Sequence, residues 1–211
     1  MLEFPEYVKA FVGLVAVTNP IGAIPIFISL TPNEGIEDRH VIARTTATSV
    51  TLILLIALMA GEFVLDFFGI SISSFRVGGG ILILLMAISM LHARLSPTVH
   101  TKAEAEESDS KESIAVVPLA IPLLAGPGAI SAVVLDAHKG TGIGHYSIVS
   151  IEIMTVGTCI WTALYLAPLI SQRLGTTGMN IVTRIMGLIL AAIAVEFIAK
   201  GIRGLFPALG S

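Results

Sequence analysis

Six apolar stretches alternate with short polar segments along the 211-residue chain. They cover residues 7–30, 41–68, 75–91, 114–135, 146–170 and 181–202. A helix needs about 20 apolar residues to cross a bilayer, so the pattern predicts an all-α polytopic membrane protein with six transmembrane helices. The single long hydrophilic stretch, 96–113, carries five acidic and two basic residues and is typical of a solvated linker. We therefore expect two membrane units, 1–95 and 114–211, joined by a charged linker at 96–113.

Composition supports this class and excludes others. Only 13% of the residues are charged, against about a quarter in soluble domains. A net charge of −3 gives no basic face for nucleic acid, and the one cysteine, Cys159, cannot form a disulfide within the chain. The histidines form no ligand-spaced cluster, and no hydrolase, zinc-protease or nucleotide-binding motif is present. We expect no enzyme activity, no metal and no cofactor.

The two halves share short motifs at nearly constant spacing. RVGGGIL at 76–82 matches RIMGLIL at 184–190 with an offset of 108, and GAI recurs at 22–24 and 128–130 with an offset of 106. A repeat of three spans reverses its direction in the membrane, so the prediction is two inverted three-helix repeats. Secondary transporters often have this architecture, with the substrate site between the repeats.

The first stretch contains a helix break. Asn19 is a preferred residue before a helix, and Pro20 is favoured at the first helical position. Gly22 and Pro25 follow within one to two turns, and proline inside a helix costs about 3 kcal/mol or more. The pattern predicts two half-helices rather than one continuous span.

The fourth stretch has a matching break at Gly126-Pro127-Gly128, followed by Ala129. A helix that starts at mid-membrane presents unpaired N–H groups and about half a positive charge, which suits a carboxylate, while freed carbonyls suit an ammonium. Small residues leave room only for a small ligand. We predict a site for a small zwitterion, with the alternative that the breaks serve packing alone. Its residues would be Asn19, Pro20, Gly22, Pro25, Gly126, Pro127, Gly128 and Ala129.

Charged residues in the apolar stretches are further candidates. Glu196 is a candidate for ion coupling, although Lys200 one turn later offers it a local ion pair. Glu152 is interpreted as interfacial. Arg76 and Arg184 begin equivalent spans and are interpreted as structural ties, at the interface or at the end of a half-helix.

Orientation follows from the basic residues of the loops. Six lie on one side and four on the other, which predicts that both termini lie outside the cytoplasm. The six are Arg39, Arg44, Arg94, Lys102, Lys111 and Arg173, and the four are Lys9, Lys139, Lys200 and Arg203.

Four segments together resemble the MarC/SnatA family of integral membrane proteins: NPIGAIPIF, SFRVGGGIL, VVPLAIPLLAGPGAIS and TRIMGLILAAIAVEFIAKGI. The resemblance runs from Phe4 to Leu209. It implies a six-span inner-membrane protein, kinship with LysE-type exporters, and transport of small neutral amino acids in some members.

These observations lead to one hypothesis and two alternatives. The hypothesis is a secondary transporter of a small neutral solute, such as an amino acid, driven by an ion gradient, for uptake or export. The alternatives are a non-transporting membrane scaffold and a multidrug efflux protein, the latter disfavoured by an aromatic content of 6%. The expected partners are the solute and the lipid bilayer, and association into a homo-oligomer is left open.

Overall fold

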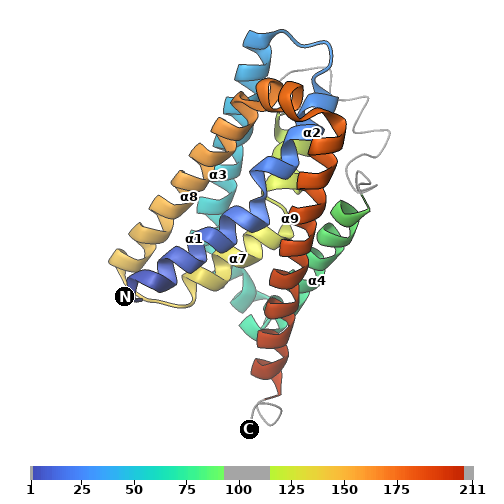
Figure 1. The fold of residues 1–211 in the computed structure, drawn as a ribbon. Coiled ribbons are helices and arrows are strands. Elements are labelled where there is room, and N and C mark those ends of the chain that lie inside the picture. The colour runs from blue at the N-terminus through green and yellow to red at the C-terminus, as the bar shows by residue number, and fades with distance from the viewer. Residues whose placement is uncertain (1, 93–114, 207–211) are drawn as a thin grey trace.

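The computed structural model describes residues 2–92 and 115–206, and this part of the chain contains helices and no strand (Figure 1). The helices are α1 (Phe4–Thr18), α2 (Pro20–Leu30), α3 (Ile36–Phe67), α4 (Ile72–Leu91), η2 (Ala115–Leu124), α7 (Pro127–Ala137), α8 (Ile143–Tyr165) and α9 (Ala167–Leu205). The linker 96–113 lies outside the described residues, so the predicted division into two units stays a prediction.

Within the described residues, five segments are long and apolar enough to cross a membrane by length and composition. They are Phe4–Leu30, Ile36–Phe67, Ile72–Leu91, Ile143–Tyr165 and Thr177–Leu205. The predicted span at 114–135 is divided between η2 and α7, which have 10 and 11 residues. At 1.5 Å per residue neither crosses about 30 Å of hydrocarbon. The described part of the chain is therefore all-helical with several candidate spans, and the count of six stays a prediction.

The region between the last two predicted spans differs from expectation. α8 ends at Tyr165, five residues before the predicted end of its span, and α9 begins at Ala167. The predicted loop is thus largely helical. Gly175 interrupts α9 with a φ of 59°, a conformation that glycine adopts without the strain a Cβ would cause.

Equivalent helices of the two halves run in opposite directions. Figure 1 shows α1 and α2 rising from the N-terminus while η2 and α7 descend, and α3 and α8, like α4 and α9, are antiparallel. α4 packs most extensively on α9, and α3 packs on α8. The short helices that follow the two breaks each pack on a long helix of the other half: α2 packs on α9, and α7 packs on α4. A pseudo-two-fold relation between the halves would produce this pattern.

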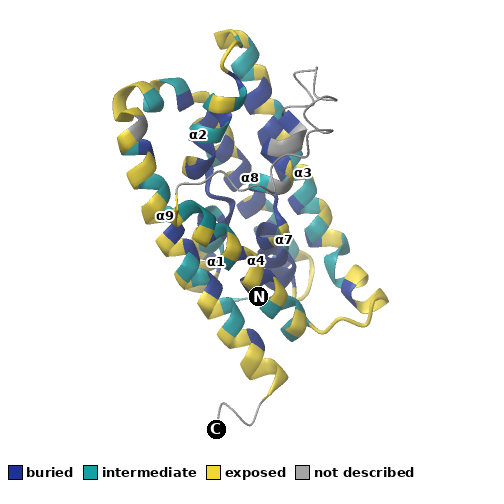
Figure 2. Ribbon diagram, turned by 90° about the vertical axis from the view of Figure 1, so that its right-hand side faces the viewer, coloured by how far each residue is buried: buried dark blue, intermediate teal, exposed yellow. Residues whose placement is uncertain are grey.

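The short helices lie inside the bundle and the long ones around it. Nine of the 11 residues of α7 are buried, and Figure 2 shows its buried ribbon inside the exposed outer faces of α3 and α9. Large apolar side chains such as Leu52, Met59, Leu85 and Leu188 are exposed on the outer helices. This surface matches a lipid environment rather than water.

Glycines allow the close packing of α4 on α9. A Cβ on Gly80 would lie 3.0 Å from the carbonyl oxygen of Ala194, and one on Gly187 would lie 3.1 Å from that of Ala87. The backbones therefore approach as closely as small-residue interfaces in membranes permit. Gly78 faces open space and has no such role.

Candidate functional site

The first helix break lies at Asn19, as the sequence predicts. Asn19 has a left-handed backbone (φ 47°) that ends α1, and its Oδ1 accepts a hydrogen bond of 3.0 Å from the N–H of Gly22 in α2. Its Nδ2 lies 3.3 Å from Sδ of Met90, which ties the break to α4. A Cβ on Gly22 would lie 2.1 Å from Asn19 Nδ2, so the capping side chain occupies the space that glycine leaves.

The second break lies at Gly126, which precedes α7 with extended backbone (φ −71°, ψ 173°). The incoming helix η2 is a π-helix that contains Pro118 and Pro122. Proline lacks the N–H that an α-helix needs, and the helix ends with a π-type bond of 2.8 Å from Ala125 N to Ala120 O. The predicted break is confirmed.

The two breaks lie side by side in the interior. A Cβ on Gly128 would lie 2.6 Å from Ile83 Cγ1 and 3.4 Å from Val17 Cγ1. Val17 is two residues before the first break, and Gly128 is two residues after the second. The structure therefore brings the breaks together, and in this conformation they are closely packed.

The predicted substrate residues divide into two groups. Those buried around the breaks are Asn19, Pro20, Gly22, Gly126, Gly128 and Ala129. Pro25 lies inside α2, which continues through it, so this proline adds no second interruption. Pro127 is exposed. Substrate binding by any of them stays a prediction.

A cavity of about 480 Å³ lies between α1, α4, α7 and α9. Its lining includes Leu14 and Val17, both buried, so it reaches within two residues of the first break. The exposed residues Glu6 and Lys9 line it about two turns earlier on α1. Its volume falls in the range of about 300–1,000 Å³ that is usual for small-molecule sites. The cavity thus lies beside the helix breaks, whereas the sequence predicted a site at the breaks themselves.

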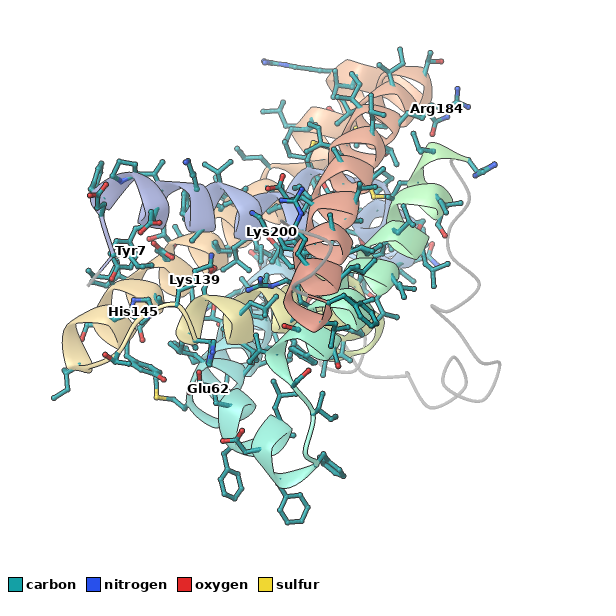
Figure 3. The ribbon with its side chains drawn as sticks, turned by 90° about the horizontal axis from the view of Figure 1, so that it is seen from below. Tyr7, Glu62, Lys139, His145, Arg184 and Lys200 are labelled. Atoms are coloured by element: carbon teal, nitrogen blue, oxygen red, sulfur yellow. The ribbon has the colours of Figure 1, made fainter. Side chains whose placement is uncertain are left out.

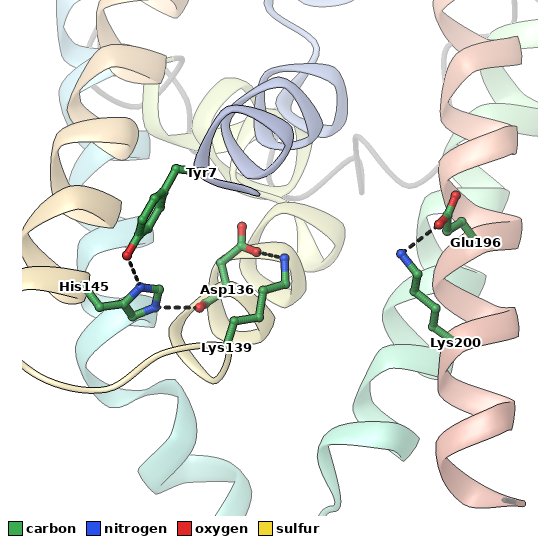
Figure 4. A network of polar contacts seen from close by, with 6 residues as sticks. All are labelled: Tyr7, Asp136, Lys139, His145, Glu196 and Lys200. Carbon is green, nitrogen blue, oxygen red and sulfur yellow. Dashed lines mark hydrogen bonds and ion pairs between the residues drawn. The ribbon is translucent and has the colours of Figure 1, made fainter. Parts of the chain in front are cut away.

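Seven charged side chains line this cavity, three acidic and four basic. They are Glu6, Lys9, Arg76, Asp136, Lys139, Glu196 and Lys200. Figure 4 shows two ion pairs among them, Asp136 with Lys139 beside α7 and Glu196 with Lys200 on α9, the second at 2.7 Å. Among the described residues, Lys9 and Arg76 have no acidic partner. The cavity therefore combines paired charges of both signs with surplus positive charge.

The outcome for the predicted charged residues is mixed. The ion pair of Glu196 with Lys200 is confirmed. Arg76 lies on the cavity wall. Arg184 lies 16 residues before Lys200 on α9, about 24 Å along the helix, and Figure 3 shows it far from Tyr7 and Lys139. In the described part of the chain neither arginine bonds to a helix end, so a structural tie stays a prediction for both.

A different arginine binds the end of a short helix. Arg39, in the first turn of α3, donates from Nε and Nη2 to the carbonyl oxygen of Thr31 after α2, at 3.1 and 2.6 Å. In the second half, His145 in the first turn of α8 donates from Nε2 to the carbonyl oxygen of Asp136 at the end of α7, at 2.9 Å. The two donors are 106 residues apart. The repeat offset, applied to basic residues at helix starts, could have indicated both.

His145 also fixes the cavity wall. It is fully buried, and since a carbonyl can only accept, Nε2 carries its proton and Nδ1 accepts from the hydroxyl of Tyr7 at 2.9 Å. A Cβ on Gly140 would lie 2.7 Å from the imidazole, so glycine leaves room for the ring. The chain of contacts joins α1, α7 and α8 at Asp136 (Figure 4).

Glu152 is a further candidate that is buried inside the bundle. It is the tenth residue of α8, about 14 Å from the start of the helix, and it is 9% exposed. Its interfacial position stays a prediction. It lies within electrostatic reach of Asp136 and Lys139. A buried carboxyl group inside a membrane helix is a functional candidate.

Comparisons with known proteins place the chain in a family. The family model described as MarC family integral membrane protein matches residues 4–206. The chain is 44% identical to the UPF0056 membrane protein YhcE of Escherichia coli over 207 residues, 98% of this chain and 96% of the relative. It is 41% identical to YvbG of Bacillus subtilis over the whole of both chains, and 38% identical to MJ1677 of Methanocaldococcus jannaschii over 96% of this chain and 98% of that one. No solved structure gives a significant match.

Proposed function

Since the chain belongs to the MarC family of integral membrane proteins, we propose that it is a secondary transporter in the cell inner membrane. The solute is a small neutral amino acid, moved inward or outward and driven by an ion gradient. One observation carries this proposal: a charged cavity ends beside two helix breaks that lie in contact. Paired breaks in corresponding spans are typical of transporter substrate sites.

The cavity chemistry supports a zwitterion. The unpaired cations Lys9 and Arg76 suit a carboxylate, and an arginine binds a carboxylate through two parallel hydrogen bonds. Asp136 and Glu196 on facing walls suit an ammonium. The buried part of the lining is apolar, with Leu14 and Val17, which suits an uncharged side chain.

The arrangement of the helices supports two inverted repeats of three spans, with η2 and α7 together forming the fourth span. Equivalent helices pair with each other, and equivalent residues, Arg39 and His145, bind the ends of the two short helices. The start of α1, the end of α9 and the exposed cavity residues Glu6 and Lys200 lie on one side, which the charge bias of the loops assigns to the outside of the cytoplasm. Transport would then need one half to rock against the other and open the packed breaks to the opposite side.

Ion coupling would use the carboxylates next to the solute. Glu152 is buried and close to Asp136, so a proton or a cation that binds this pair would change the charge of the cavity wall. Glu196, the candidate from the sequence, is exposed, whereas Glu152 and Asp136 are buried. We therefore place coupling at Glu152 and Asp136 ahead of Glu196.

The test is flux of labelled glycine, alanine and serine by the purified protein in liposomes, with and without a proton or sodium gradient. Arg76→Gln should raise the half-saturating concentration about tenfold or more, as expected for the loss of a charge-assisted bond. Arg203→Gln is the matched control, since Arg203 is exposed on the same side and does not line the cavity. Absence of gradient-dependent flux across a broad amino acid panel would refute the proposal.

The breaks are tested separately. Gly128→Leu would place a large side chain against Ile83 and Val17, where even a Cβ lies within 2.6 Å of Ile83. Normal expression with loss of flux would support a moving contact between the breaks. Unchanged flux would remove the breaks from the transport path.

A further inference from the structure

A second concave site lies on the outer surface, away from the cavity. It is a groove of about 620 Å³ between α3 and α8. On α3 it extends from Arg44 to Leu55, and on α8 from Met154 to Trp161. None of the four helices around the charged cavity contributes to it.

One end of the groove is cationic and aromatic. Arg44 is exposed there, and among the described residues its guanidinium has no acidic partner. Trp161 lies at the same end, 5.5 Å from Tyr165 between ring centroids, and Tyr165 stacks on His40 at 4.1 Å. Aromatic rings with basic residues are typical of the level where lipid headgroups meet hydrocarbon.

The rest of the groove offers few free polar groups, although three threonines line it. Their hydroxyls donate to carbonyl oxygens of their own helices: Thr48 to Arg44 at 2.9 Å, Thr51 to Ala47 at 2.8 Å and Thr158 to Met154 at 3.0 Å. Each hydroxyl proton is therefore used within its helix. The remaining lining offers methyl and methylene groups, which suit an acyl chain better than a polar solute.

The floor of the groove depends on a close approach of the two helices. A Cβ on Gly157 of α8 would lie 2.0 Å from Oγ1 of Thr51 on α3. The helices touch at this point, and their larger neighbours Leu52 and Trp161 stand on either side. The result is a furrow rather than a hole through the bundle.

The length of the groove matches one leaflet of a bilayer. Arg44 and Leu55 are 11 residues apart, about 17 Å along α3, and half of the hydrocarbon core is about 15 Å. The cationic end lies on the side opposite the start of α1 and the end of α9. The loop charges assign this side to the cytoplasm, where anionic lipids are concentrated. We propose that the groove binds one anionic phospholipid, with its phosphate at Arg44 and an acyl chain along Thr51 and Leu55.

Trp161 makes this proposal measurable, because it is the only tryptophan of the chain. The full-length protein is placed in two sets of phosphatidylcholine vesicles. One set contains a small fraction of phosphatidylglycerol that is brominated on its acyl chains, and the other contains the same fraction of phosphatidylcholine that is brominated in the same way. Bromine quenches tryptophan fluorescence at contact. One basic residue near the surface contributes about 1 kcal/mol to anionic lipid binding. Brominated phosphatidylglycerol should therefore reach the same quenching as brominated phosphatidylcholine at about a fivefold lower fraction of the lipid.

Arg44→Gln should abolish this difference between the two analogues. Arg173→Gln is the matched control, since Arg173 is an exposed arginine on the same side and does not line the groove; it should retain the difference. Should Arg44→Gln fail to fold, competition replaces it: unbrominated phosphatidylglycerol should relieve the quenching of the unaltered protein.

Three results would overturn the proposal. The first is equal quenching by the two analogues, which indicates ordinary bulk lipid. The second is a difference that persists in Arg44→Gln. The third is absence of quenching by either analogue, together with cross-linking between copies at the groove, which would show that a second copy of the chain covers it.

Discussion

Replacement of Asn19 separates the two requirements of the first helix break, the left-handed backbone and the capping bond. Asn19 is the only non-glycine residue with positive φ in the described chain. Asn19→Gly keeps this backbone accessible and costs a few tenths of a kcal/mol for the cap. Asn19→Ala costs about 1 kcal/mol for the cap and about 1–2 kcal/mol for the left-handed conformation. The alanine variant should therefore be less stable than the glycine variant by about 2 kcal/mol.

The assay is thermal unfolding of the purified variants in detergent, followed by the emission of Trp161. For a chain of this length, 1 kcal/mol shifts Tm by about 2–4 °C, so the alanine variant should melt about 4–8 °C below the glycine variant. The unaltered protein should melt highest. Equal Tm values for the two variants, or a higher value for alanine, would refute the reasoning about the backbone.

A second substitution tests the capping geometry. In the unaltered protein a Cβ on Gly22 would lie 2.1 Å from Asn19 Nδ2, so Gly22→Ala should destabilise it. In the Asn19→Gly background the colliding side chain is absent, and Gly22→Ala should have little effect. The same loss of stability in both backgrounds would show that the contact between the two residues is not the cause.

Further predictions concern the buried contacts and the orientation. Thr46→Val removes a buried hydrogen bond of 3.1 Å to the carbonyl of Ala115, so we expect a loss of about 1–2 kcal/mol in thermal unfolding; Thr155→Val, on an exposed helix face, should have almost no effect. His145→Phe should lower Tm more than Tyr7→Phe, since it leaves both a hydroxyl and a carbonyl without their partner, and equal shifts would contradict this account. Reporter fusions at the two termini should both be active outside the cytoplasm, and opposite locations would contradict an even number of spans.

The helix breaks could be predicted because their signals are local. Asn19-Pro20 and Gly126-Pro127 each combine a residue that caps or releases a helix with one that starts it. Pro25 does not interrupt α2, which loses only the bond from one missing N–H at this position and continues. The effect of an isolated proline depends on tertiary packing, which the local sequence does not contain.

The charged cavity could not be predicted, apart from the pair of Glu196 and Lys200 at helical spacing. Its other charged residues come from α1, α4 and the end of α7, and only the packing of these helices brings them together. Arg39 and His145 were missed for another reason. They occupy equivalent positions but are different residue types, so a search for identical motifs passes over them.

The proposed inverted repeat also bears on the role of the arginines. Exchange of the two halves, as the proposed mechanism requires, would replace the present cavity by one between η2, α2, α4 and α9, open on the opposite side. Arg184 is the equivalent of Arg76 at an offset of 108. Arg184, which does not line the cavity in this conformation, would then take the position that Arg76 has now.

The other charges of the cavity are not repeated in this way. At the offset of 106 set by the GAI motif, Asp136 corresponds to Leu30, and at the offset of 108 set by the arginines, Glu196 corresponds to Ile88. The equivalent opening would thus keep the arginine but offer apolar side chains in place of these carboxylates. Because an apolar side chain gives an ammonium no partner, the side with the start of α1 and the end of α9 should hold a zwitterion more tightly. The proposed transporter would accordingly bind its solute with higher affinity on one side of the membrane, while an arginine receives the carboxylate on both.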